Sequence, residues 1–254
     1  MLYNYHTHTA RCNHASLAPE REYVEKAIEA GMKTFGFSDH APYLFAGTDY
    51  QSCFRMKRDE IELYADTVRA LAKEYEKDIR ILCGFELEYY PDYHKEEMQF
   101  LQSVKPDYLI LGQHFLGNEL NNQPVHNRLK TDEDLSAYVT QVLAGLATGD
   151  FLYLAHPDIA GAHYSPEAVE REYTRLCEGA KRMGIPLEIN FLGLRTNRCY
   201  PNAALLKIAA KVGNEIVFGL DSHEPESVND PTTLQKAHSL VDKFGLKLIE
   251  KPFF

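Results

Sequence analysis

Hydrophobic residues follow two alternating patterns along the chain. Short apolar runs rich in β-branched and aromatic residues recur between longer stretches in which apolar residues return every three or four positions. The short runs predict buried strands, and the longer stretches predict amphipathic helices. Because strands and helices alternate throughout, the pattern favours a parallel sheet built from βα units.

The expected elements fill the chain without a repeat, a low-complexity tract or a linker, so we expect residues 1–254 to form one domain. The expected strands span residues 2–6, 34–38, 79–83, 108–111, 151–155, 186–189, 216–220 and 246–249. The expected helices span residues 19–31, 58–76, 95–103, 134–148, 166–183, 202–212 and 230–244, and residues 117–131 are expected to form a loop. Seven or eight βα units in about 250 residues match the size of a TIM-like barrel.

Most of the expected strands end in a side chain that can bind a metal ion. Because the carboxyl ends of the strands in a parallel barrel open on one face, we expect these side chains to meet there. His6 and His8 are two residues apart and point the same way in a strand, so they can converge on one ion. The candidate metal ligands are His6, His8, His14, His40, Glu86, His114, His156, Asp221 and His223.

Nine candidate ligands suit two or three ions, since an ion in a catalytic site has about three or four protein ligands. Imidazole and carboxylate donors suit Zn²⁺, Mn²⁺ or Fe²⁺. Closely spaced ions activate a bridging water and hold the oxygens of a phosphoryl group during in-line displacement. The pattern therefore predicts a polynuclear metal site suited to phosphate esters.

Simpler explanations exist for single members of this set. A lone histidine at a strand end is more often structural, and Asp39 with His40 could cap a loop. Glu88 could serve in place of Glu86, because both lie on one face of the expected strand. Only the joint pattern favours a metal site. The other histidines are expected to face solvent: His94, His126, His163 and His238.

Other enzyme classes lack their sequence signatures. Ser222 lies between Asp221 and His223, but it has no flanking glycines of the kind found at the nucleophile elbow of a serine hydrolase. A phosphate-binding P-loop and a dinucleotide-binding glycine fingerprint are also absent from the sequence.

The composition excludes several kinds of partner. The net charge of −10 argues against a nucleic-acid-binding surface, although bound cations would still allow an anionic substrate. The five cysteines are scattered and lack C-x-x-C spacing, which argues against a disulfide framework or a zinc ribbon. No signal peptide and no apolar run of membrane length is evident, so we expect a cytoplasmic protein that does not bind membranes.

Seven short motifs follow one another along the chain: His6-Thr-His8 with Cys12-Asn-His14-Ala15, Gly36–Tyr43, Gly84–Tyr89, Gly112–Phe115, Ala155–Asp158, Glu188–Arg195 and Gly219–His223. Together they resemble the motifs of the polymerase-and-histidinol-phosphatase (PHP) superfamily, and in particular of its histidinol-phosphatase branch. The resemblance covers nearly the whole chain. It implies an α/β fold, namely a distorted (β/α)7 barrel similar to a TIM barrel, with the active site at the C-terminal ends of the strands and three divalent ions.

The resemblance also implies a division of the ligands among the ions. His6, His8, Glu86 and Asp221 would hold the first ion, Glu86, His114 and His156 the second, and His14, His40 and His223 the third. A metal-bridging hydroxide would attack the phosphorus of a monoester. The substrate this branch implies is L-histidinol phosphate, hydrolysed to L-histidinol and phosphate in histidine biosynthesis. Asp221 or a metal-bound water would then protonate the leaving group.

Three further residues are expected to contact the substrate: Asn190, Arg195 and Arg198. Arg195 matches a position expected to bind phosphate, for which a guanidinium group is well suited. The sequence departs from the family where some members carry an arginine shortly after His156, because His163 is the only basic candidate here. Another small phosphate ester or a nucleotide therefore remains an alternative substrate, and a non-catalytic metal-binding barrel an alternative function. The oligomeric state stays open.

Overall fold

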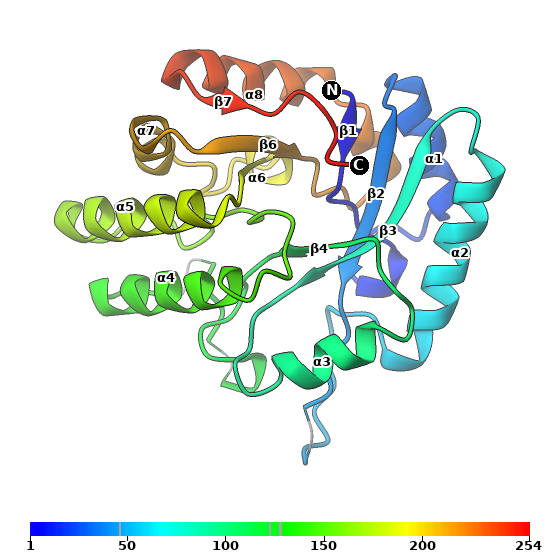
Figure 1. Cartoon of the computed structure of the whole chain (residues 1–254), viewed down its shortest axis with the longest axis horizontal. Helices are drawn as coiled ribbons and strands as arrows, with labels where there is room; N and C mark the ends of the chain where they lie inside the picture. Colours follow the sequence, from blue (N-terminus) through cyan, green and yellow to red (C-terminus); the bar gives the residue numbers. More distant parts are fainter. Residues whose placement is uncertain (46, 122, 127–128) are drawn as a thin grey trace.

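The strands form the inner layer of the molecule and the helices the outer layer (Figure 1). The computed structural model describes residues 1–45, 47–121, 123–126 and 129–254. The strands are β1 (Tyr3–Asn4), β2 (Thr34–His40), β3 (Arg80–Leu87), β4 (Tyr108–Leu111), β5 (Leu187–Asn190), β6 (Glu215–Gly219) and β7 (Lys247–Leu248). The α-helices are α1 (Glu20–Glu29), α2 (Ile61–Glu74), α3 (His94–Leu101), α4 (Asp132–Leu146), α5 (Pro166–Met183), α6 (Phe191–Arg195), α7 (Ala203–Val212) and α8 (Pro231–Phe244). Short 3-10 helices are η1 (Ala10–Cys12), η2 (Arg58–Glu60), η3 (Glu119–Asn121) and η4 (Pro225–Val228).

The parallel strands close into a ring. β1, β2, β3 and β4 pair in that order, and β5, β6 and β7 form a second sheet. Leu154 joins the two sheets on one side, because it pairs with Leu111 of β4 and with Leu187 of β5. On the other side Thr7, after β1, pairs with Ser222, after β6. The predicted distorted barrel is therefore confirmed.

Three of the expected strands are shorter than the hydrophobic pattern predicted. The one expected at 246–249 is the two-residue strand β7. β1 has only two residues, because a side-chain hydrogen bond takes the place of backbone pairing at its end. In this bond Leu220 N donates to Asn4 Oδ1 at 3.0 Å. The stretch 151–155 contributes the single bridging residue Leu154, whose N–H donates to Pro186 O at 3.0 Å. The ring of strands is least regular at β1 and at Leu154.

Capping residues explain where the helices begin and end. α5 has the predicted bounds, because Ser165 Oγ accepts from Ala168 N at 3.2 Å and Gly184 takes a left-handed conformation at the other end. The stretch expected as one helix at 58–76 divides into η2 and α2. α6 was not predicted, because five residues are too few to show helical periodicity. Its cap is Asn190, whose Oδ1 accepts from Gly193 N at 3.0 Å.

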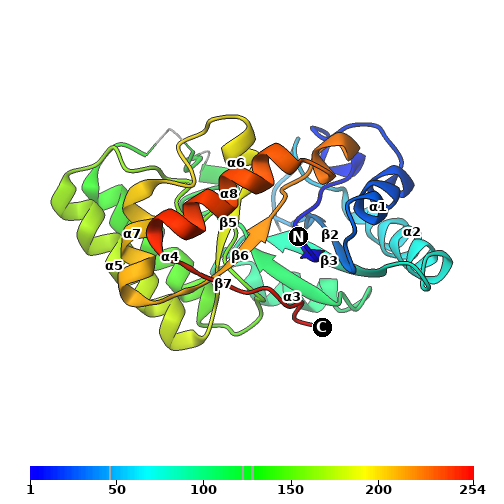
Figure 2. The same ribbon diagram turned by 90° about the horizontal axis from the view of Figure 1, so that it is seen from above.

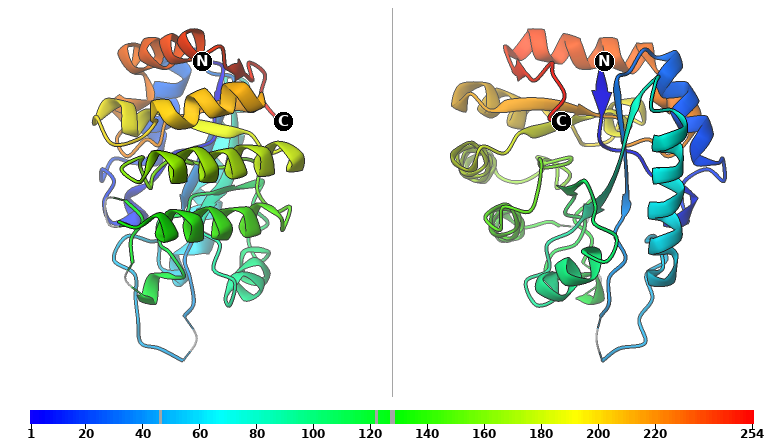
Figure 3. Two further views of the ribbon diagram at one scale, coloured as in Figure 1. Left: turned by 90° about the vertical axis from the view of Figure 1, so that its left-hand side faces the viewer. Right: turned by 45° about the vertical axis from the view of Figure 1, so that its right-hand side comes forward.

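The helices pack in two groups around the strands. α4, α5, α7 and α8 lie side by side, and α2 covers β3 on the other side of the barrel (Figure 3). Inside the ring, aromatic residues such as Tyr5, Tyr108 and Tyr153 fill the end opposite the strands' carboxyl ends. The two termini meet there (Figure 2), where Phe253 N donates to Tyr5 OH at 3.0 Å.

The remaining expectations concern loops and membrane contact. The expected loop at 117–131 contains η3, and its residues 122, 127 and 128 lie outside the described part of the chain. Among the described residues, no helix combines the length and the apolar character needed to cross a membrane.

Candidate metal centre

The strand ends bring the predicted ligands together around Glu86. Five imidazoles present a ring nitrogen within 3.7 Å of its carboxylate: those of His6, His8, His40, His114 and His156. The shortest separation joins His156 Nε2 to Glu86 Oε1 at 2.7 Å. Both carboxylate oxygens have imidazole neighbours, so Glu86 occupies the position expected of a ligand shared between ions.

The described residues form five groups of three donors whose ligand atoms lie within 4.8 Å of one another. They are His6/His8/Glu86, His40/Glu86/His114, His6/His156/Asp221, His14/His40/His223 and His8/Cys12/His223. All nine predicted ligands occur in these groups. The first and fourth groups agree with the sets expected for the first and third ions. His156 is grouped with His6 and Asp221, although its ring lies nearer that of His114 than that of His6, with centroids 4.8 and 5.8 Å apart. The assignment of ligands to particular ions therefore stays a prediction.

Cys12 is a potential metal ligand that is not among the nine predicted ones. It is fully buried in η1, which follows the first strand rather than ending it, so a search of strand ends passes over it. Its thiol donates to Thr9 O at 3.2 Å.

Two glycines make room for buried carboxylates of the site. A Cβ at Gly112 would overlap the Glu86 carboxylate, and a Cβ at Gly219 would overlap that of Glu188. Both glycines belong to motifs that were named above for the histidine or aspartate they contain.

The backbone is strained at two of the predicted ligands, because His156 and Asp221 have positive φ angles of 29° and 47°. Such strain is typical of functional sites.

Buried carboxylates behind the cluster face the second ring nitrogen of three histidines. Glu188 Oε1 lies 2.8 Å from His6 Nδ1, Asp39 Oδ1 lies 3.6 Å from His8 Nδ1, and Glu88 Oε1 lies 3.4 Å from His114 Nδ1. A carboxylate in this position fixes the proton and the orientation of a metal-binding imidazole. The alternative of Glu88 as the central ligand is not supported, because β3 ends at Leu87 and Glu88 pairs with Arg55 instead.

Burial and charge act in opposite directions on these groups. Burial alone would raise the pKa of Glu86, but His114, His40 and His6 hold that pKa well below its ordinary value. Burial, with the nearby His8, lowers the pKa of His223 to about 3. Burial would also lower the pKa of His6, but the surrounding carboxylates, Glu188 foremost, raise it to about 10. The cluster thus combines a carboxylate that stays ionised with imidazoles that differ in how readily they take up a proton.

Several buried atoms of the cluster have no hydrogen-bond partner in the described structure. They are His6 Nε2, His8 Nδ1 and Nε2, His40 Nδ1, Glu86 Oε2, His114 Nδ1 and His156 Nδ1. A buried polar atom without a partner costs about 1–3 kcal/mol, so this many in one place would be unusual for a purely structural cluster. Divalent cations would give those of these atoms that face the centre, such as His6 Nε2, His8 Nε2 and Glu86 Oε2, the partner they lack. The donor set, imidazole nitrogen and carboxylate oxygen, suits zinc, manganese or iron.

The cluster forms the floor of a cavity of about 470 Å³. Its walls include the aromatic residues Phe54 and Phe115, whose rings stack with centroids 5.5 Å apart. Tyr200, Arg198 and His126 also line it. A cavity of this size accommodates one small organic molecule, since ligand pockets run from roughly 300 to 1,000 Å³.

The three expected substrate contacts have different surroundings. Arg198 is exposed and lines the cavity, with Nη1 donating to Tyr200 OH at 2.9 Å. Arg195 is half-buried, with Nη2 3.4 Å from Leu220 O and a buried Nη1 that has no partner among the described residues. Asn190 is buried, and its Nδ2 donates to Glu188 Oε2 and to Asp221 Oδ2 at 2.8 and 3.0 Å. Their contacts with a substrate stay predictions.

The histidines outside the cluster differ partly from the expectation that they face solvent. His163 and His238 are exposed, as expected. The expectation was wrong for His94, which is buried because Asp150 pairs with its Nε2 at 2.8 Å and Tyr89 packs on its ring. It was also wrong for His126, which is half-buried and lines the cavity.

Curated relatives of the chain include histidinol-phosphatases. The chain is 28% identical to the "Probable histidinol-phosphatase" of Deinococcus radiodurans over 231 residues, which cover 88% of this chain and 86% of that protein. It is 26% identical to the histidinol-phosphatase of Bacillus subtilis, over 88% of this chain and 94% of the relative. The sequence resemblance to the histidinol-phosphatase branch is confirmed by these relatives.

The fold matches a solved structure and a family model. The histidinol phosphate phosphatase of Lactococcus lactis, solved in complex with zinc, L-histidinol and phosphate, superposes with a TM-score of 0.73. The match covers 97% of this chain and 95% of that one at 22% identity, a level at which it concerns the fold. The model of the PHP domain matches residues 4–191. The chain therefore belongs to the PHP domain family.

Proposed function

We propose that the protein is a metal-dependent phosphomonoesterase that hydrolyses L-histidinol phosphate to L-histidinol and phosphate. The observation that carries this proposal is the set of five imidazoles around the Glu86 carboxylate on the floor of a cavity for one small molecule. The relationship to histidinol-phosphatases supports it. Three divalent ions held by the nine ligands would activate water and neutralise the phosphate oxygens during attack on phosphorus.

The protein's own residues would fix the reacting groups in this proposal. Asn190 holds Asp221 through one oxygen while the other faces His8 at 3.3 Å, so the carboxylate has a single orientation. His6, followed by His8 and His223, keeps the pKa of Asp221 well below its ordinary value against the opposing effect of burial. An ionised Asp221 suits a ligand better than a proton donor. We therefore propose that the leaving alkoxide takes its proton from water.

Phosphate and leaving group would contact different parts of the cavity. Arg195, with its unpartnered Nη1, and Arg198, which lines the cavity, are the first cationic side chains after β5, and both suit phosphate oxygens. The stacked rings of Phe54 and Phe115 offer a flat apolar wall for a planar group such as imidazole. His126 and Arg198 would replace the arginine that some family members carry after the histidine matching His156.

A phosphate-release assay over a small panel tests this proposal. The panel contains L-histidinol phosphate, a sugar phosphate, a nucleoside monophosphate and an aryl phosphate, each with zinc- or manganese-loaded protein. We expect the highest kcat/KM for L-histidinol phosphate and no release by the Glu86→Gln variant. A clear preference for another ester would reject the substrate and keep the reaction class. No release from any ester by the fully metal-loaded protein would reject the phosphatase function itself.

A further inference from the structure

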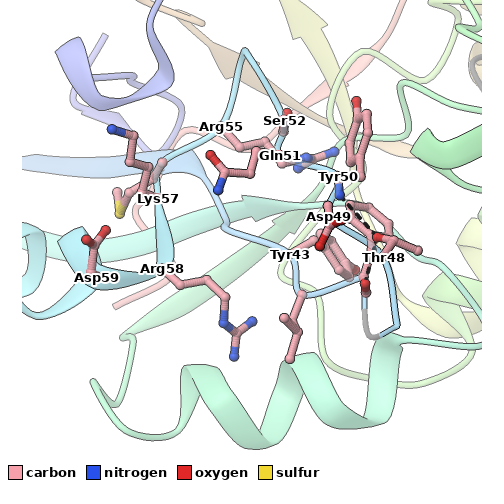
Figure 4. A pocket seen from close by; sticks show the side chains of 13 residues that line it. Tyr43, Thr48, Asp49, Tyr50, Gln51, Ser52, Arg55, Lys57, Arg58 and Asp59 are labelled. Carbon is pink, nitrogen blue, oxygen red and sulfur yellow. Dashed lines mark hydrogen bonds between the residues drawn. The ribbon is translucent and has the colours of Figure 1, made fainter.

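One fully buried arginine, Arg55, joins the ends of β2 and β3 to η3 from outside the cavity. Its side chain is only 1% exposed, although it comes from the loop that follows β2 (Figure 4). Nη1 lies 3.3 Å from Ala41 O, directly after the ligand His40. Nη2 donates to Glu88, directly after β3, and Nε donates to Glu119 Oε2 at 2.7 Å. In Figure 4 the side chain turns away from its surface neighbours Lys57 and Arg58.

Glu88 connects this arginine to the ligand His114. Its Oε2 accepts from Phe115 N at 3.2 Å, so it holds the backbone next to His114. Its Oε1 lies 3.4 Å from His114 Nδ1, which has no hydrogen-bond partner in the described structure. A carboxylate facing Nδ1 favours a proton on that nitrogen. The lone pair of Nε2 is then directed toward Glu86, whose Oε1 lies 3.7 Å away.

Arg55 holds the Glu88 carboxylate in this place. Its Nη2 donates to Glu88 Oε1, the oxygen that faces His114, while Glu88 Oε2 accepts from Tyr90 OH and from Phe115 N. The two carboxylates that Arg55 joins, those of Glu88 and Glu119, are each 1% exposed. Removal of the guanidinium leaves a buried carboxylate without its paired cation, so Glu88 would no longer be held behind His114 Nδ1.

We propose that Arg55 is a positioning residue that acts through Glu88 on His114 and thereby sets the affinity of one ion of the centre. The proposal rests on the proposed function only in taking His114 as a metal ligand. Arg55 touches neither the cavity floor nor a reacting atom. It acts by holding the Glu88 carboxylate in place behind the imidazole.

The test measures zinc binding rather than turnover, so that it does not depend on the substrate. Full-length protein and the variants Glu88→Gln, Arg55→Met and the double variant are stripped of metal and titrated with zinc against a chelator of known affinity. The variant His114→Ala identifies the zinc equivalent that the imidazole of His114 binds. Glu172→Gln is the matched control, because Glu172 is a 2% exposed carboxylate paired with Arg175 on α5, outside the centre.

We expect Glu88→Gln and Arg55→Met each to weaken one zinc equivalent by about 10–100-fold, the usual cost of losing such an outer partner. His114→Ala should weaken the same equivalent, and Glu172→Gln should weaken none. The double variant should be no weaker than the weaker single variant, because Arg55 acts through Glu88. If Arg55→Met does not fold, Arg55→Lys, which keeps the charge but cannot bond to all three partners, should weaken the same equivalent by less.

Two results would overturn the proposal. One is that Glu88→Gln, or the folded Arg55 variant, binds all zinc equivalents as tightly as the parent. The other is that the loss of zinc affinity in the double variant equals the product of the two single losses. Independent effects of this kind would exclude an action of Arg55 through Glu88. Thermal unfolding in excess chelator accompanies each titration, so general loss of stability is separated from loss of one ion. The proposed function fails separately, by absence of phosphate release in protein that holds its metals.

Discussion

The Gly112→Ala substitution tests how far the metal centre depends on the close approach of β4 to Glu86. The added Cβ would overlap the Glu86 carboxylate, which would have to move by roughly 1.5 Å before ordinary contact was restored. That carboxylate cannot move freely, because five imidazoles surround it. Its contacts with His156 at 2.7 Å and His40 at 3.1 Å would be lost first.

We expect this variant to fold but to lose metal and activity. Overpacking of this kind costs about 1–3 kcal/mol of unfolding free energy. A misplacement of about 1 Å near the reacting groups costs about 100-fold in rate, so kcat/KM should fall at least that much. The assays are phosphate release, metal content per chain and chemical unfolding in the presence of chelator.

The matched control is Gly179→Ala in α5. A Cβ there meets only the end of the Leu143 side chain, which can turn aside. This control should keep its metals and its activity. If Gly112→Ala also kept full activity and metal content, the placement of Glu86 at the centre of the cluster would be wrong.

Three further perturbations probe separate parts of the molecule. Glu188→Gln removes the acceptor 2.8 Å from His6 Nδ1, so metal affinity measured by chelator competition should fall about 10–100-fold, and an unchanged affinity would contradict that role. Phe54→Ala removes one wall of the cavity and should raise KM for L-histidinol phosphate about 10-fold with little change in kcat, whereas a fall in kcat alone would place Phe54 elsewhere in the reaction. Burial, opposed by Arg58, raises the pKa of Glu97 to about 7. Because the folded protein then binds the extra proton below that pH, unfolding free energy should fall by up to about 3 kcal/mol as pH rises from about 4.5 to 7. Glu97→Gln should flatten this fall in denaturant titrations at pH 5 and pH 8, and an unchanged slope would show that Glu97 titrates normally.

Elements with strong local signals could be predicted from the sequence. α5 was placed at its observed bounds, because Ser165, Pro166 and Gly184 mark both ends and its apolar residues repeat with helical spacing. α6 was missed, because five residues carry no periodicity. The strand at 151–155 reduced to one bridging residue, because the apolar run reports burial and not ladder length.

The ligands of the candidate site were predictable because their positions relative to the strands repeat along the chain. Parallel topology then brings these strand ends together without further information. The residues behind them were not predictable in the same way. Arg55 and Glu188 belong to contacts between segments far apart in sequence, and a buried ion pair leaves no pattern in either segment. Glu88 could not be separated from Glu86 until the end of β3 was known.

In the proposed function, the cluster around Glu86 holds metal ions on which phosphate release depends. Zinc or manganese is added stepwise to chelator-treated protein, and bound metal and release from L-histidinol phosphate are measured on the same samples. We expect up to three bound equivalents per chain, no activity in the metal-free protein, and activity that rises only as the sites fill. Full activity in metal-free protein, or fewer than two equivalents bound by active protein, would contradict it.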